Sequence, residues 1–268
     1  MTIEMMPKID WDTFPESDGE PMAETQANAI QMVDLIFALT TLVTNQGRSA
    51  HTAVGGNQLM YYNRDNGRDH IAPDVYVILD YPPPPPSSWR VWEHGKFPEI
   101  VFEISSPSTT DIDVSETEGE GKRWRYGMLE VREYYIYDPQ GELDPRLQGF
   151  VLNGKRLERM ATEPDGSIYS PLLGAELRQV GEFLRVIDPA TGFPLLTPDE
   201  TRERLTNTEG RLVTTQERLS DAEGRLSDAE ARLGDERRTR QAVEERAAYT
   251  EEALRQALAR LGEQRPPT

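Results

Sequence analysis

The sequence has no cysteine and only three histidines among its 268 residues, His51, His70 and His94. Without thiols the chain has neither disulfides nor thiolate zinc sites. The three histidines are also far apart in the sequence, which argues against a histidine-rich metal centre. A metal site built on histidine or cysteine is therefore not expected.

Targeting and membrane signals are also missing from the pattern. The first residues, MTIEMMPKIDWDTFPE, lack the basic start and apolar core of a signal peptide. No apolar run is expected to approach the ~20 residues that a membrane helix needs. These observations predict a soluble cytoplasmic protein, long enough for one large or two small domains with a real core.

Positive charge is scarce in the first 200 residues, which carry 16 Lys and Arg against 33 Asp and Glu, a net charge of -17. Residues 201–268 are nearly neutral, with 13 against 14. An acidic body argues against broad non-specific attraction to nucleic acid, which normally comes from surfaces rich in Lys and Arg. The difference also indicates that the body and the tail are separate units.

The hydrophobic periodicity predicts a helix from about residue 22 to 43, ended by the segment 45–47. Its apolar stripe is expected to run through Ile30, Val33 and Phe37, with polar positions at Asn28, Gln31 and Asp34. Short strand-like runs follow, NQLMYY and DVYVILD, separated by the turn-rich NRDNGRD. The segment YPPPPPSSW is incompatible with a helix or a central strand and is expected at the surface.

A second helix is predicted from about residue 116 to 129, because Ser115 and Glu118 have the spacing of a capping box. This helix would place Lys122 and Tyr126 one turn apart on the same face. It leads into the aromatic strand REYYIYD, and further short strands are expected between residues 147 and 185. The order of elements predicts an α+β fold with a mixed sheet flanked by helices.

Two carboxylates occupy unusual positions in apolar strands. Glu103 stands inside PEIVFEISSPS, where burying its charge is unfavourable unless a metal ion or a cationic partner compensates. Asp74 stands at the entry of the preceding strand, in APDVYVI. If the strands are neighbours, the two carboxylates converge and suit Mg²⁺ or Mn²⁺. A lysine beside such a metal would suit phosphodiester hydrolysis, since its ammonium stabilises the charge that develops on the phosphate.

Four motifs occur in a specific order: SDGEPMAET, APDVYVI, PEIVFEISSPST and GKRWRYGMLEVREYYIYDP. Together they resemble the Uma2 family of restriction endonuclease-like proteins over roughly residues 15 to 190. The resemblance implies a fold of the PD-(D/E)XK nuclease superfamily, with a restriction-endonuclease-like mixed sheet and a metal-dependent catalytic site. It implies an endonuclease that hydrolyses DNA with Mg or Mn.

The resemblance also assigns roles to individual residues. Asp74 and Glu103 match the acidic metal ligands, and Glu24 on the first helix is a candidate third ligand. Ser105 stands where the superfamily usually has its lysine, so Lys122 on the following helix is the matching cation. The catalytic set implied is Asp74, Glu103 and Lys122, with Tyr126 and Ser105 as candidates for contact with substrate.

Each of these residues also has a purely structural interpretation. Asp74 could cap a turn at a strand entry, Glu103 could pair with Arg125 in a buried ion pair, and Lys122 could be a solvated charge. The acidic pair of the segment DID, at 111 and 113, follows a Ser/Thr-rich loop and is interpreted as turn and cap residues. Alternation in the aromatic strand favours core packing for its tyrosines, Tyr134, Tyr135 and Tyr137.

The alternative function is a catalytically silent, nuclease-like scaffold or regulatory binding protein that assembles through its tail. The acidic body favours this alternative, whereas the set of Asp74, Glu103 and Lys122 favours the enzyme.

The tail begins with TPDE at 197–200, a capping box with proline at the first helical position, which predicts a helix from Pro198. From there leucines recur every seven residues, at 205, 212, 219, 226 and 233, and return in phase at 254 and 261. With leucine at position a, the d positions hold mostly small residues, Thr208, Thr215, Ala222, Ala229, Val243 and Ala257. This heptad pattern predicts a coiled coil.

The flanking charges indicate how two such helices would pair. A parallel pair would match Arg204 with Glu209, Arg218 with Glu223 and Arg225 with Glu230, whereas an antiparallel pair would oppose arginines. A parallel homodimer is therefore expected, and a single solvated helix is the alternative. The predicted organisation is a nuclease-like domain over 1–190, a linker over 191–197 and a coiled-coil helix over 198–264.

Overall fold

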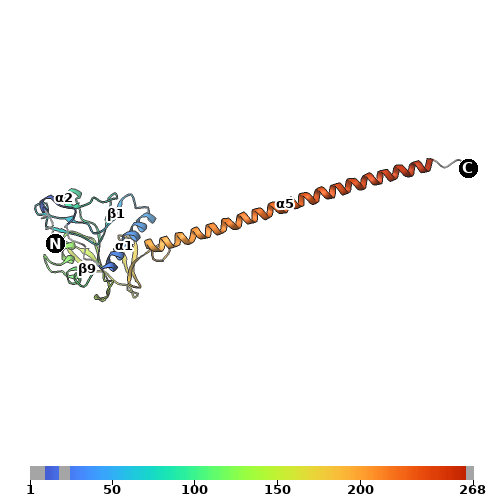
Figure 1. The fold of residues 1–268 in the computed structure, drawn as a ribbon. Coiled ribbons are helices and arrows are strands. Elements are labelled where there is room, and N and C mark those ends of the chain that lie inside the picture. Colours follow the sequence, from blue (N-terminus) through green and yellow to red (C-terminus); the bar gives the residue numbers. More distant parts are fainter. Residues whose placement is uncertain (1–9, 18–24, 264–268) are drawn as a thin grey trace, which may run out of the picture. The chain divides into compact units, whose positions relative to one another are not determined.

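A computed structural model describes residues 10–17 and 25–263 of the chain (Figure 1). The chain divides into two compact units, Met1–Thr201 and Arg202–Thr268. The first unit, called the body here, contains all the strands of the described residues. The second consists of most of one long helix.

The body is built on a six-stranded mixed sheet. Its strands, in spatial order, are β1 (Thr52–Gly55), β4 (Val75–Leu79), β6 (Ile100–Ile104), β7 (Glu133–Tyr137), β8 (Leu147–Asn153) and β9 (Arg156–Arg159). Strands β6 and β7 pair in parallel, and the other neighbours pair antiparallel. Parallel neighbours require a crossover connection, and here it runs from residue 105 to 132. The predicted α+β fold with a mixed sheet is confirmed.

Two small sheets accompany the central one. The first contains β10 (Ile168–Ser170), β11 (Ala175–Val180) and β12 (Phe183–Ile187). The second contains β3 (His70–Ile71), β2 (Met60–Tyr61) and β5 (Trp89–Arg90), next to the short helices η1 (Trp11–Thr13) and α2 (Val91–His94). The segment 81–88, with its run of prolines, lies outside helices and strands as expected.

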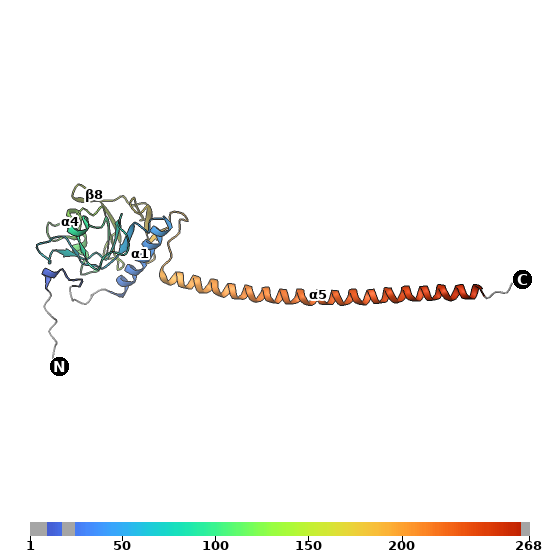
Figure 2. The ribbon, with the colours of Figure 1, turned by 90° about the horizontal axis from the view of Figure 1, so that it is seen from above.

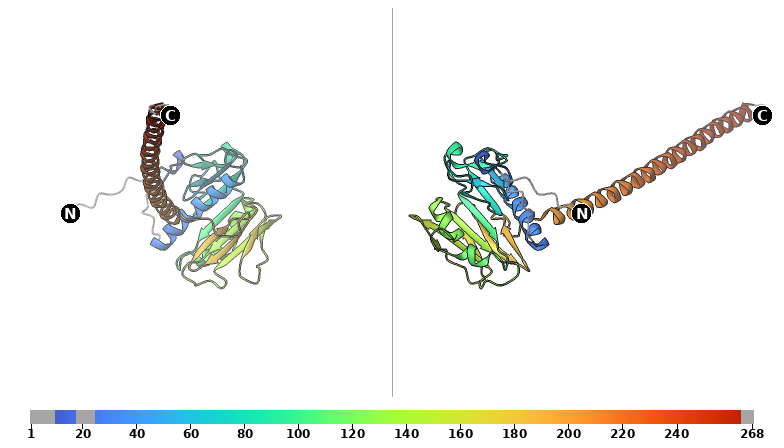
Figure 3. Two further views of the ribbon diagram at one scale, coloured as in Figure 1. Left: turned by 90° about the vertical axis from the view of Figure 1, so that its right-hand side faces the viewer. Right: turned by 60° about the vertical axis from the view of Figure 1, so that its left-hand side comes forward.

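Helix α1 (Gln26–Asn45) lies along one face of the central sheet and contacts β1, β4, β6 and β12 (Figures 2 and 3). Its first turn is capped by Thr25, whose side chain accepts a hydrogen bond from the Asn28 amide. Residues of α1 such as Leu35 and Leu39 pack with alternate residues of β4 and β6 and with the β10–β12 sheet. These contacts form one of the two clusters of the core.

The buried face of α1 differs from the predicted stripe. Ile30 and Val33 are 44% and 58% exposed, while Asn28 and Gln31 are buried. Asn28 donates to the Ile104 carbonyl at 3.1 Å, and Gln31 both donates to the Leu184 carbonyl and accepts from its amide. The two polar side chains are therefore buried because they bond to strand backbone that periodicity does not reveal.

Helix α1 also corrects the expectation about apolar runs. By length and composition, its 20 residues are apolar enough to cross a membrane. The packing of its buried face on the sheets gives this composition a structural explanation. Within the part of the chain that the structure describes, it is the one helix that meets this criterion.

The opposite face of the central sheet carries the second cluster. Here Val101 of β6 packs with Tyr134 and Ile136 of β7 and with Tyr126 from the crossover. All three tyrosines of β7 are fully buried, which confirms that they belong to the core. Glu103 points to this same face, because side chains alternate along a strand.

The crossover contains two short helices, α3 (Thr110–Val114) and α4 (Lys122–Met128), instead of the predicted helix over 116–129. Ser115 is the C-cap of α3 with an extended backbone, and its hydroxyl donates to Thr117 at 2.8 Å. The predicted capping box is therefore wrong. Gly119 has a φ of +80°, and a Cβ on Gly121 would lie 2.0 Å from the Ser115 carbonyl oxygen, so the chain turns sharply here before α4 begins.

Helix α4 packs closely on strand β9 through a glycine. A Cβ on Gly127 would lie 2.6 Å from the backbone oxygen of Lys155, in the turn that precedes β9. Only a residue without a side chain allows this approach of the two backbones. Gly127 therefore determines how near α4 lies to the sheet.

Helix α5 (Pro198–Glu263) begins where the sequence predicts. The Glu200 amide donates to the Thr197 hydroxyl at 3.2 Å, and the Glu200 carboxylate accepts from the Thr197 amide at 2.8 Å, so the capping box is confirmed. Arg185 of β12 makes two hydrogen bonds with Glu200, at 3.0 and 2.6 Å. This pair holds the first turn of α5 on the body.

Candidate functional site

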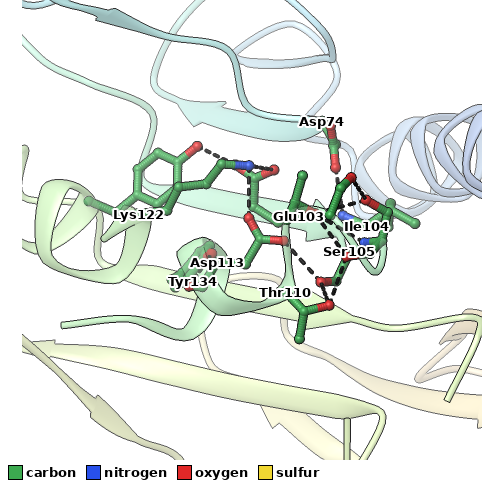
Figure 4. A network of polar contacts seen from close by, with 12 residues as sticks. Asp74, Glu103, Ile104, Ser105, Thr110, Asp113, Lys122 and Tyr134 are labelled. Atoms are coloured by element: carbon green, nitrogen blue, oxygen red, sulfur yellow. Dashed lines mark hydrogen bonds and ion pairs between the residues drawn. The ribbon is translucent and has the colours of Figure 1, made fainter. Parts of the chain in front are cut away.

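Strands β4 and β6 are antiparallel neighbours, with Val75 opposite Phe102. This register places Asp74 beside Glu103, so the two carboxylates lie on neighbouring strands and converge. Asp74 is half-buried, and its Oδ2 accepts a hydrogen bond from the Ile104 amide at 2.6 Å (Figure 4). This hydrogen bond holds the start of β4 against β6.

The Glu103 side chain is 1% exposed and has a partner for each oxygen. Its Oε2 lies 2.8 Å from Nζ of Lys122, and its Oε1 accepts from the Tyr126 hydroxyl at 2.5 Å. Lys122 and Tyr126 lie one turn apart on α4 and both reach Glu103. Arg125, the alternative partner of Glu103, donates instead to the Gly119 carbonyl. The compensating cation is therefore Lys122.

Asp113 of α3 is a third carboxylate in the site, which the sequence analysis interpreted as a turn or cap residue. That interpretation is wrong, because the Asp113 side chain is 1% exposed and its Oδ1 lies 2.8 Å from Nζ of Lys122 (Figure 4). The contact is an ion pair. Its neighbour Asp111 is exposed. Sequence spacing does not show which of the two aspartates is buried, because only the packing of α3 turns Asp113 inward.

Ser105, at the position of the usual lysine, is fully buried. Its hydroxyl donates to Asp113 Oδ2 at 3.0 Å and lies 3.0 Å from the Thr110 hydroxyl. The Tyr134 hydroxyl donates to the Asp113 carbonyl at 3.0 Å. Ser105 and Tyr126 are therefore bonded to the site's carboxylates. Glu24, the candidate third metal ligand, lies outside the residues that the structure describes.

Burial and charge act against each other in this cluster. Burial raises the pKa of the Glu103 carboxyl well above its usual range; Lys122 opposes this effect, and Asp74 and Asp113 add to it. Burial alone would lower the pKa of Lys122, but the carboxylates of Glu103, Asp113 and Asp74 together raise it. Lys122 therefore keeps its positive charge at neutral pH. Burial also raises the pKa of the Tyr126 phenol, with Glu103 as the next cause, so Tyr126 remains a hydrogen-bond donor.

Comparison with known proteins identifies the family. The family model Uma2, described as a putative restriction endonuclease, matches residues 13–181. The chain belongs to the Uma2 family. The resemblance inferred from the four motifs is thereby confirmed.

A solved structure similar to the Uma2 chain is a putative nuclease from Anabaena variabilis. The two share 15% identity with a TM-score of 0.38, over 59% of this chain and 82% of that one. No curated protein matches the sequence. The whole of α5 lies beyond the family match, which ends at residue 181.

The donor set of the Uma2 chain can be compared with the needs of a divalent metal. Asp74, Glu103 and Asp113 offer carboxylate oxygens, the ligands that Mg²⁺ and Mn²⁺ prefer. Three carboxylates face one ammonium, and burial, followed by the charges of Asp74 and Asp113, raises the pKa of the Glu103 carboxyl, so a further cation would stabilise its charged form. The chemistry of the donor set therefore fits a hard divalent ion.

The distances between these carboxylates fit a metal ion less well than their chemistry does. Among residues 10–17 and 25–263, no group of three acidic or histidine side chains is close enough to hold a metal together. Lys122 Nζ lies between Glu103 and Asp113. Asp74 and Glu103 would thus be the residues that hold an ion, with remaining positions left to water and substrate.

Proposed function

We propose that this chain is a metal-dependent endonuclease that hydrolyses phosphodiester bonds in DNA, with Mg²⁺ or Mn²⁺ held by Asp74 and Glu103. The observation that carries the proposal is the position of Lys122, whose ammonium is held 2.8 Å from both Glu103 and Asp113 beside Asp74. This arrangement of Lys122 and the carboxylates occurs in a member of the Uma2 family, whose model is described as a putative restriction endonuclease. An ammonium next to paired carboxylates suits phosphodiester hydrolysis, because the carboxylates can hold a metal ion and the ammonium can stabilise charge that develops on the phosphate.

Each residue has a distinct role in this proposal. A bound metal would polarise the phosphate and activate a water molecule. Lys122, protonated at neutral pH, stabilises the negative charge that develops on the phosphate oxygens. Tyr126 orients Glu103, and Ser105 orients Asp113. Both hydroxyls are bonded inside the protein, so we assign them positioning roles in place of substrate contact.

Cleavage of supercoiled plasmid DNA tests the proposal. We expect the full chain to cut with Mg²⁺ or Mn²⁺ and not with EDTA. Asp74→Asn and Glu103→Gln should each lower the cleavage rate by at least about a hundredfold, because each weakens a metal ligand without removing core volume. Asp111→Asn, which changes an exposed carboxylate of the same segment, is the control and should cut normally. Native rates in both site variants would overturn the proposal.

A catalytically silent scaffold is the second candidate function. It is favoured by Glu103, because both of its oxygens are already bonded within the protein. Calorimetric titration with Mg²⁺ separates the two candidates. If the chain is an enzyme, Mg²⁺ binding to the native chain should release or absorb heat, and this heat should be lost in Glu103→Ala. If the chain is a silent scaffold, the native chain and Glu103→Ala should give the same trace.

We also propose that α5 pairs with α5 of a second copy in a parallel coiled coil. The heptad leucines from position 205 to position 254 are 55–63% exposed, which is unusual for a repeated apolar stripe. Residues of the same seam line a shallow hollow further along, namely Val243, Ala247, Thr250 and Leu254, with Arg246 and Glu251 at its edges. A second helix of the same sequence would cover both regions.

The charges along the seam favour the parallel arrangement. Besides the three pairs noted in the sequence, Arg246 would face Glu251 of the partner helix, on either side of the hollow. Arg232 would face Arg237, an unfavourable match near Arg240, where the leucine stripe is interrupted. The pairing is therefore best before and after this interruption. Such a dimer would bring two nuclease bodies to one duplex.

A further inference from the structure

Trp124 and Met128 form an apolar surface on the side of α4 that does not reach Glu103. Lys122 and Tyr126 are four residues apart and contact the carboxylates, while Trp124 and Met128, also four apart, line two neighbouring pockets. The pockets have volumes of about 340 and 500 Å³ and share these two residues. The two pockets therefore share Trp124 and Met128, which lie on the helix that carries the site lysine.

Basic side chains line both pockets. The first contains Arg123, Lys155 and Arg156, and the second contains Arg68 and Arg125. These are five of the 16 Lys and Arg among the first 200 residues, and they outnumber the three carboxylates that line the same pockets, Glu116, Glu118 and Asp69, so positive charge is concentrated here in an otherwise acidic body. Such a concentration suits a ligand with phosphate groups.

These basic residues differ in how far they are already paired. Glu116 pairs with Arg123 at 2.6 Å and with Arg156 at 3.3 Å, and Arg123 also packs over the Phe150 ring. Arg156 is nevertheless 78% exposed. Arg125 donates to a backbone carbonyl, and Arg68 has no carboxylate partner among the residues described by the structure. Arg68, Arg125 and Arg156 therefore keep donors for a phosphate.

The indole of Trp124 differs from those of the other tryptophans. Trp11 stacks on His70, Trp89 is buried and stacks on His94, and Trp92 packs on Phe14. Within the described chain, the Trp124 ring has no aromatic neighbour and its N–H has no acceptor. A ring that lines two pockets and has no ring partner is suited to stack on a planar ligand.

We propose that the α4 surface, defined as Arg68, Trp124, Arg125, Met128 and Arg156, binds an unpaired nucleotide of the nucleic-acid substrate. The base stacks on Trp124, and the arginines on both sides pair with the neighbouring phosphates. The choice of nucleic acid as the ligand rests on the proposed function. An unpaired nucleotide is required because the π-face of a base is free to stack only outside a duplex.

Binding of a fluorescein-labelled oligo-dT, measured by anisotropy in EDTA, tests this proposal without cleavage. Trp124→Ala should weaken binding about tenfold, and Trp124→Phe should restore most of it. Tyr169→Ala, which removes an exposed ring from β10, is the matched control and should bind as the native chain does. A fully paired duplex of the same length should show little dependence on Trp124.

The arginines are tested by the salt dependence of the same binding. Arg125→Gln and Arg156→Gln should each lower the slope of log K against log salt by about 0.7, the value for one phosphate contact on a single strand. Arg178→Gln, on β11, should leave the slope unchanged. Equal affinity and slope in native and variant proteins, or equal losses in the control variants, would overturn the proposal.

The two proposals can fail separately. If plasmid cleavage is independent of Asp74 and Glu103 while Trp124→Ala still weakens oligo-dT binding, the α4 surface stands and the assigned catalytic site does not. If cleavage depends on both carboxylates but Trp124→Ala and Trp124→Phe bind oligo-dT like the native chain, only the α4 surface is refuted. Matching melting temperatures would show that the variants are folded.

Discussion

Nζ of Lys122 lies 2.8 Å from Oδ1 of Asp113, and the two residues come from consecutive short helices of one crossover. The aspartate is buried and the lysine is one-fifth exposed, so the ammonium is held from the protein side. A charge held in this way does not have to be repositioned during a reaction, which is what electrostatic stabilisation of a transition state requires.

Weakening this pair should lower turnover without removing the lysine. In Asp113→Asn we expect cleavage to slow about tenfold, equivalent to about 1.4 kcal/mol, because the neutral amide attracts the ammonium less. Metal affinity should change little. Single-turnover cleavage beside Asp111→Asn checks this. A native rate in Asp113→Asn would show that Asp113 does not position Lys122 for the reaction.

Removing the lysine should have a larger effect. Lys122→Ala is expected to lower turnover by about a hundredfold or more, the range for loss of one charge-stabilising donor. Its affinity for Mg²⁺ should fall much less, because Lys122 supplies no metal ligand. Lys122→Met, which keeps most of the side-chain stem, should behave like Lys122→Ala. If turnover is unchanged in both, another cation serves the phosphate.

The buried carboxylate should make stability depend on pH. Burial raises the folded-state pKa of Glu103 above its usual value of 4.5, so the folded chain keeps this proton to a higher pH than the unfolded chain does. Between these two pKa values the folded state binds more protons, and the free energy of unfolding must fall as pH rises. Glu103→Gln should remove this part of the slope. Urea unfolding of both proteins from about pH 5 to pH 8 measures it, and identical slopes would show that the Glu103 pKa is not raised.

The tail should determine the oligomeric state. We expect sedimentation to show a dimer for the full chain and a monomer for a version ending at Thr201. The truncated version ends at Thr201 so that the body keeps the buried Leu195 and the hydrogen bonds between Arg185 and Glu200. If both proteins sediment as monomers at micromolar concentration, or both as dimers, α5 is not the dimerisation element.

A charge exchange tests whether the paired helices are parallel. Arg225→Glu should weaken the dimer, because it places a negative charge against Glu230 of the partner helix. Adding Glu230→Arg in the same chain restores opposite charges and should recover the dimer. Failure of the double variant to recover would contradict the parallel register.

Asp74 and Glu103 stand out in the sequence as carboxylates in apolar strands, whereas Lys122 is selected only by the resemblance to the Uma2 motifs. The sequence predicts that the two carboxylates converge if their strands are neighbours, and the register shows that the strands are neighbours. Asp113 was missed because its burial depends on how α3 packs. Local periodicity contains no information about that contact.

The same limitation explains the errors in the helices. Asn28 and Gln31 were placed on the outer side of α1, yet they bond to backbone groups 76 and 153 residues away. The helix predicted over 116–129 is interrupted at Gly119, which has a φ of +80°, and at Gly121, which lies against the Ser115 backbone. In each case the decisive partner is a backbone group, which leaves no trace in side-chain patterns.

The close approach at Gly127 has a consequence for how such a site can change during evolution. Because the lysine stands on a crossover helix, its distance from Glu103 depends on where α4 rests against the Lys155 backbone. A side chain at position 127 would push the helix away from β9 and carry the ammonium with it. The proposed activity should therefore be adjusted, or lost, by a substitution that touches neither the carboxylates nor the lysine, while the strands that hold the carboxylates keep their sequence.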